Sequence, residues 1–124
     1  MKELTKAEEQ VMKILWELES GFVHDIIERM PEPKPAYNTV STIVRILVKK
    51  DFVSFDAYGK THKYYPTVSK DSYSKFFLSN FIGGYFGGSF QNMVSFFAKQ
   101  TDMDVSEMDE LMSQVKQKME YNDE

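Results

Sequence analysis

The chain has 124 residues, of which 42% are hydrophobic and 27% are charged, with a formal net charge of −4. This length and composition predict one compact domain, or a small domain with an appendage, in which most residues fold. The absence of Cys excludes disulfides and thiolate metal sites and favours a reducing cytoplasm.

The start of the chain predicts two short helices followed by a turn. Thr5 and Glu8 have the spacing of a capping box, placed just before an apolar stripe that begins at Val11. A second, short helix is expected from Phe22 to Met30. The run MPEPKPA then has Pro at alternate positions, which no helix interior tolerates, so we expect a connecting turn there.

Residues 36–50, AYNTVSTIVRILVKK, predict a third helix with two unlike faces. Helical periodicity places four apolar side chains on a buried face: Val40, Ile43, Val44 and Leu47. The opposite face carries Asn38, Ser41, Thr42, Arg45 and Lys49. Short polar side chains can hydrogen-bond to base edges and phosphates, and the two cations extend the reach to the phosphate backbone. Such a helix fits the major groove of DNA, although a simply solvated Ser/Thr face is the plain alternative.

Two runs rich in strand-forming residues follow, FVSFDA and HKYYPT, on either side of Tyr58-Gly59-Lys60-Thr61. They predict a β-hairpin with a glycine-containing loop. Three helices and a hairpin are the order of a winged helix-turn-helix, and the hairpin would bring four further residues near DNA: Lys60, Thr61, His62 and Lys63. Residues 34–65 carry six basic and two acidic side chains, a local balance of +4, whereas residues 66–124 carry the acidic excess.

The remainder of the chain predicts helices with apolar faces. Tyr73 to Phe81 fit one helix, which the glycine pairs at 83–84 and 87–88 are expected to end, and Phe90 to Phe97 suggest another. A final helix would begin at Ser106. We expect these faces to bury themselves against a second copy of the chain, through Phe76, Phe77, Phe81, Phe90, Met108, Leu111, Met112, Val115 and Met119.

Several of these runs occur together in one known family. LTKAEEQVMKILWE, YNTVSTIVRILVKKDFV, GKTHKYYP and FFLSNFIGGYFGGSFQNMVSFF resemble the BlaI/MecI/CopY family of bacterial repressors over nearly the whole chain. The resemblance implies a homodimer that binds an inverted-repeat operator in double-stranded DNA. The family's DNA-contacting positions carry over to Asn38, Thr39, Ser41 and Thr42. Ile46 departs from the pattern, because members often have Arg at that place.

The resemblance also suggests how repression would end. In the antibiotic-resistance branch of the family, a membrane-bound sensor protease triggers cleavage in the C-terminal domain. The family's scissile Asn-Phe pair aligns with Ser95 and Phe96, so Ser stands where the family has Asn. The copper-responsive branch uses a Cys-rich metal site, which a chain without Cys cannot form.

We therefore predict a mainly α fold with a small β-hairpin wing: a winged-helix DNA-binding domain over residues 1–68 and a helical dimerisation domain over residues 69–124. The expected protein is a cytoplasmic repressor, without a cofactor, a metal ion or membrane insertion. A winged helix that serves only as a protein-interaction module is the alternative, which salt-dependent duplex binding would distinguish. An enzyme is not expected, because no nucleophile–base arrangement or phosphate-binding loop is visible.

Overall fold

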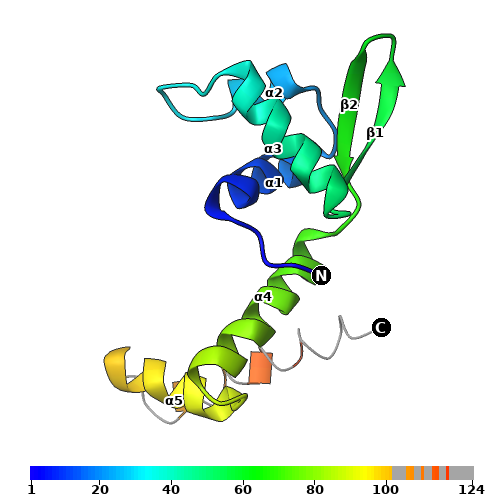
Figure 1. Ribbon diagram of the computed structural model, residues 1–124. Helices are drawn as coiled ribbons and strands as arrows, with labels where there is room; N and C mark the ends of the chain where they lie inside the picture. Colours follow the sequence, from blue (N-terminus) through cyan, green and yellow to red (C-terminus); the bar gives the residue numbers. More distant parts are fainter. Residues whose placement is uncertain (102–105, 108–109, 111–112, 115–116, 118–124) are drawn as a thin grey trace. The chain divides into compact units, whose positions relative to one another are not determined.

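The computed structural model describes residues 1–101, 106–107, 110, 113–114 and 117. The chain divides into two compact units, Met1–Lys70 and Asp71–Glu124. The elements in chain order are α1 (Lys6–Leu18), α2 (Val23–Glu28), α3 (Tyr37–Lys49), β1 (Val53–Tyr58), β2 (Thr61–Pro66), α4 (Lys70–Tyr85) and α5 (Phe90–Thr101) (Figure 1). The first unit thus has three helices and an antiparallel hairpin, which confirms the predicted winged helix-turn-helix.

The predicted capping box starts α1. The Glu8 amide donates a hydrogen bond of 3.2 Å to Thr5 Oγ1, and the Thr5 amide donates one of 3.0 Å to Glu8 Oε1. These two bonds satisfy amides that the first helical turn would otherwise leave without partners. The helix then buries its apolar stripe in a core shared with the other elements of the first unit, whose fully buried side chains are Val11, Met12, Leu15, Ile26, Val40, Val44, Leu47 and Phe52.

Lys34, in the proline turn, caps the C-terminal end of α2. Its Nζ donates hydrogen bonds of 3.2, 2.9 and 2.9 Å to the carbonyl oxygens of Ile27, Glu28 and Met30. The first two carbonyls belong to the last turn of α2 and the third lies two residues beyond it, where intrahelical donors run out and the helix dipole favours a cation. Lys34 therefore serves the fold, although the charge pattern had counted it with the basic residues of the DNA-binding half.

The end of α3 is a Schellman motif built on a non-glycine residue. The Asp51 amide donates to the Val48 carbonyl (3.1 Å) and the Phe52 amide donates to the Leu47 carbonyl (3.0 Å). Asp51 has the left-handed conformation that this motif requires, with φ of 64°. Phe52 follows with a fully buried side chain. The motif turns the chain out of α3 and directly into the hairpin.

The hairpin is tighter than the sequence suggested. Tyr58 pairs with Thr61, so the loop contains only Gly59 and Lys60, and Gly59 has a positive φ of 64° at its first position. An isolated bridge joins Gly21 to Tyr64 through two backbone hydrogen bonds, of 2.9 and 2.8 Å. The bridge ties the hairpin to the segment between α1 and α2, and so it fixes the hairpin beside the helices.

The second unit has a small core of its own. Ile82 of α4 packs with Met93 and Val94 of α5, and the partly buried Leu78, Phe81, Phe86 and Phe90 surround them. The expected break at Gly83-Gly84 is wrong, because α4 continues to Tyr85. The turn comes at the second glycine pair, where Gly87 and Gly88 have φ of 59° and 80°. A glycine inside a helix costs only about 1 kcal/mol of stability relative to alanine, so the first pair can remain helical. The positive φ values of the second pair, by contrast, are ones that glycine adopts readily and other residues rarely do.

Within the residues that the structure describes, none of the helices is both long and apolar enough to cross a membrane. The same residues hold no cluster of three or more His, Asp or Glu side chains that could bind a metal ion.

Candidate nucleic-acid interface

The two faces of α3 separate as predicted, apart from one residue. Val40, Val44 and Leu47 are fully buried and Ile43 is half-buried. On the opposite side the side chains of Asn38, Thr42, Arg45 and Lys49 are exposed, and Thr39, about 100° from Asn38, is exposed at the edge of that face. They form the polar strip of α3, which is the name used below for these five residues.

Ser41 is more buried than its predicted place on the polar face of α3 implies. Its side chain is only 7% exposed, and its hydroxyl oxygen accepts a hydrogen bond of 3.1 Å from Arg45 Nη2. At about 100° per residue, Ser41 lies about 60° from both Asn38 and Val44, at the border between the two faces. A small side chain at that border is covered by its neighbours, so Ser41 orients Arg45 instead of standing free on the surface.

Thr42 is exposed, but its hydroxyl hydrogen is already in use. Thr42 Oγ1 donates a hydrogen bond of 2.8 Å to the Asn38 carbonyl oxygen, one turn earlier in α3. The side chain can therefore offer a base edge its oxygen as an acceptor and its methyl group as an apolar contact. Those are the groups that suit an amino group or a thymine methyl in the major groove.

An open groove of about 750 Å³ runs between α3, the start of α2 and the hairpin. It brings together six of the predicted contact residues: Ser41, Arg45, Lys49, Lys60, Thr61 and His62. Three of these side chains are permanent cations, and the one carboxylate in the lining, Asp25, accepts a 2.8 Å hydrogen bond from the Phe22 amide. The groove is therefore suited to a polyanion on charge grounds.

Aromatic rings form much of the groove wall, and the charge pattern alone did not reveal them. Phe55 stacks on His62 with ring centroids 4.1 Å apart, and His24 lies 4.9 Å from Tyr37. Burial raises the pKa of Tyr64, against the lowering effect of the nearby Arg45 charge. Strand alternation could have found part of this wall, because Phe55 and Tyr64 are directly opposite each other in the hairpin.

The remaining predicted residues lie outside the groove. Asn38 and Thr42 belong to the exposed strip of α3, and Thr39 lines a second, smaller hollow of about 360 Å³ beside the proline turn. Lys63 holds its Nζ 5.9 Å from the centroid of the Phe22 ring, a cation–π contact. Of the six basic residues between positions 34 and 65, Lys34 and Lys50 are bound to other parts of the fold.

In the second unit, the predicted contact residues differ in exposure. Phe77 is 42% exposed, whereas Phe76, Phe81 and Phe90 are half-buried. Tyr85, Phe96 and Phe97 are also exposed, and none of these three is among the predicted dimer contacts. Ser95 and Phe96 lie in α5 and are exposed. Met108, Leu111, Met112, Val115 and Met119 lie outside the described residues.

Comparison with known proteins identifies the family. A family model described as penicillinase repressor matches residues 4–117. The methicillin resistance regulatory protein MecI of Staphylococcus aureus (strain N315) is 29% identical over 110 residues, which cover 88% of this chain and 89% of that protein. The penicillinase repressor of Staphylococcus aureus is 24% identical over 110 residues, with 88% and 87% covered.

A solved structure described as the CopR repressor is 30% identical, covers 55% of this chain and 100% of its own, and superposes with a TM-score of 0.45. The family match and the relatives named above agree that the likeness is to repressors and not to enzymes. The chain belongs to the penicillinase repressor family, and it is a DNA-binding transcriptional repressor of the BlaI/MecI type.

Proposed function

We propose that the protein represses transcription as a homodimer bound to an inverted-repeat operator, with α3 of each subunit in the major groove of one half-site. The observation that carries this proposal is the polar strip of α3, an exposed helix face that adjoins a cation-lined groove. Helices that read DNA present such a face, with phosphate contacts on both sides of it.

The residues of this surface would have different roles. Asn38, Thr39 and Thr42 are short and exposed near the start of α3, where a recognition helix meets base edges. Arg45, Lys49 and Lys60 would contact phosphates, and so they would supply affinity and its dependence on salt. Thr61 and His62, beside the hairpin loop, would face the DNA backbone on the other side of the groove.

The second unit supports a dimer. Its own core is small, and four large aromatic side chains of α4 and α5 remain between 42% and 78% exposed: Phe77, Tyr85, Phe96 and Phe97. Burial of apolar surface contributes about 25 cal/mol per Å², so a second copy would stabilise these rings considerably. One winged helix also contacts too few base pairs for a unique site, which makes the pairing of subunits necessary for specificity.

Replacing Thr42 with Ala should weaken binding to a selected operator by about 1–3 kcal/mol and leave a random duplex unaffected, because the lost groups face bases. Lys49→Ala should instead weaken both duplexes alike and flatten the salt dependence. Fluorescence anisotropy over a range of salt concentrations would measure both effects. Full operator affinity in both variants would contradict this role for α3. A protein-interaction module would show no salt-dependent duplex binding at all.

We also propose that a membrane sensor-protease pathway ends repression by cleavage between Ser95 and Phe96, in the cytoplasm where operator DNA lies. Both side chains are exposed, but the bond lies within α5, so local unwinding must precede cleavage. Mass spectrometry of the repressor from induced cells should find fragments that end at Ser95. A helix-stabilising Ser95→Ala change should slow the cleavage, and intact protein released from DNA by a small molecule would exclude this route.

A further inference from the structure

Lys50 differs from the other basic residues near α3. It is the residue that follows the last turn of α3, and its side chain is 23% exposed. At about 100° per residue it lies some 20° from Ile43, on the core side of the helix, while the adjacent Lys49 lies on the polar strip. A count of charges treats Lys49 and Lys50 alike, but the fold places their side chains on different sides of α3.

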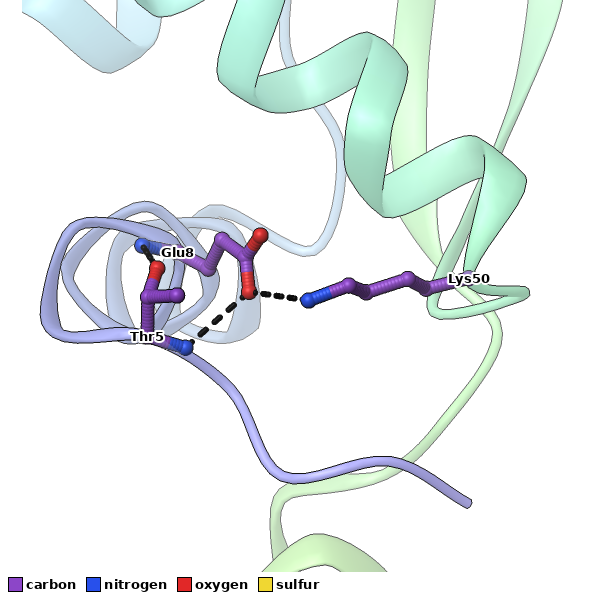
Figure 2. A network of polar contacts seen from close by, with 3 residues as sticks. All are labelled: Thr5, Glu8 and Lys50. Carbon is purple, nitrogen blue, oxygen red and sulfur yellow. Dashed lines mark hydrogen bonds and ion pairs between the residues drawn. The ribbon is translucent and has the colours of Figure 1, made fainter.

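Lys50 reaches the capping box of α1. Its Nζ donates a hydrogen bond of 2.7 Å to Glu8 Oε1, and the same oxygen accepts the 3.0 Å bond from the Thr5 amide (Figure 2). The Glu8 side chain is 7% exposed. One carboxylate oxygen therefore joins the start of α1 to the end of α3.

The setting of this ion pair makes it stronger than Lys13–Glu9 and Arg29–Glu17, two other ion pairs of the first unit. Lys13–Glu9 lies within a single helix, and Arg29–Glu17 is 3.7 Å long with both side chains more than half exposed, so each contributes little. Glu8, by contrast, is a buried anion at the positive end of α1, and Lys50 is a cation at the negative end of α3, so both helix dipoles favour the pair.

The pKa of the Glu8 carboxyl is set by two opposing effects. Burial by itself raises its pKa, but the hydrogen bonds from Lys50 and Thr5 and the charge of Lys50 outweigh burial and hold the pKa below its usual value. The carboxylate is therefore ionised at neutral pH and depends on Lys50 for its compensation. Removing Lys50 leaves a buried charge without its cation, which destabilises the arrangement more than the loss of a surface pair would.

We propose that Lys50 is a positioning residue, which sets the orientation of α3 for DNA through the buried ion pair with Glu8 and makes no DNA contact itself. This inference rests on the proposed function of α3 as the helix that reads the operator. Apolar packing against α1 alone permits small rotations of α3. A directional hydrogen bond at the end of α3 restricts the helix to one of these orientations. Base contacts require side chains in a single orientation, and phosphate contacts by long side chains do not.

The test compares Lys50→Met with Lys49→Met in the full chain, because the two residues are adjacent and the substitutions identical. The probes are a duplex selected from a random library by the wild-type protein and an unselected duplex of equal length. Lys49→Met should lower the slope of log affinity against log salt by about one and weaken both duplexes alike. Lys50→Met should weaken the selected duplex by about tenfold, change the unselected one less than twofold, and leave the slope unchanged.

Two further variants distinguish positioning from general loss of structure. Lys50→Arg keeps a cation at the same place and should restore most of the affinity for the selected duplex. Glu8→Gln combined with Lys50→Met should bind no worse than Lys50→Met alone, because no uncompensated charge remains buried. This double variant also keeps the test informative if Lys50→Met fails to fold. A reduced salt slope in Lys50→Met, or unchanged affinity for the selected duplex, would overturn the proposal.

A measurement without DNA separates this proposal from the function on which it rests. In Lys50→Met, amide hydrogen exchange should become faster in the last turn of α3 and stay unchanged in the hairpin. If the wild-type chain bound no duplex in a salt-dependent way, the proposed function would fail. The exchange data would still support the ion-pair restraint on α3, or refute it if protection in the last turn of α3 did not change.

Discussion

A chain that ends at Lys70 should be a folded monomer that binds a selected operator at least about 100-fold more weakly than the full chain. Linking two half-site contacts makes the second one intramolecular, which typically gains a factor of 10² to 10⁴ in affinity. The shortened chain should extend past the end of β2 to Lys70, because Thr67 Oγ1 donates a 2.9 Å hydrogen bond to the Asp51 carbonyl oxygen and Trp16 Nε1 donates one of 2.9 Å to the Val68 carbonyl oxygen.

Sedimentation should show the full chain as a dimer at micromolar concentration and the shortened chain as a monomer. Fusing the shortened chain to an unrelated dimeric coiled coil is the matched control, and it should recover much of the lost affinity if the second unit acts by pairing. A full-length monomer that still protects both half-sites of its operator would contradict the dimer proposal.

Phe52→Ala should destabilise the first unit by about 3–5 kcal/mol, close to the whole stability expected of a small domain. The Phe52 ring is completely buried, and its backbone amide closes the Schellman motif at the end of α3. Truncation would leave a cavity beneath the junction of α3 and the hairpin. Urea unfolding followed by Trp16 fluorescence would measure the loss, since this single Trp lies in the first unit.

Phe55→Ala is the control for the same substitution at a surface position. Phe55 lies three residues further on, with 38% of its surface exposed and its ring stacked on His62 in the groove. Its loss should change the midpoint of unfolding far less than the loss of Phe52, but it should weaken duplex binding through the altered groove wall. Equal destabilisation by the two substitutions would show that the burial of Phe52 does not dominate the stability of this junction.

Local patterns in the sequence were sufficient for much of the first unit. The Thr5–Glu8 spacing gave the start of α1 because a capping box involves only residues three apart. Periodicity separated Val40, Val44 and Leu47 from the polar strip because a helix repeats every 3.6 residues. The hairpin followed from strand-forming runs about Gly59, a residue that readily adopts the positive φ the loop requires.

The family resemblance, too, was available from sequence, and the match to the penicillinase repressor model over residues 4–117 confirms it. What it implies for individual contacts with DNA stays a prediction. Residue type and spacing indicate which side chains are suited to base edges, but affinity for a particular duplex depends on their position in three dimensions, and base contacts demand precise placement.

Tertiary structure decided the rest, because it determines what each side chain meets. Ser41 has the residue type of a DNA contact, yet its place at the border of two faces buries it against Arg45. Gly83 and Gly84 did not end α4, because neighbouring packing outweighs the low helix propensity of glycine. Lys34 and Lys50 contributed to the local positive balance of residues 34–65, but one caps the end of α2 and the other binds Glu8, 42 residues away in sequence. No local pattern can find a partner as distant in sequence as Glu8 is from Lys50, since only the fold brings the two within hydrogen-bonding distance.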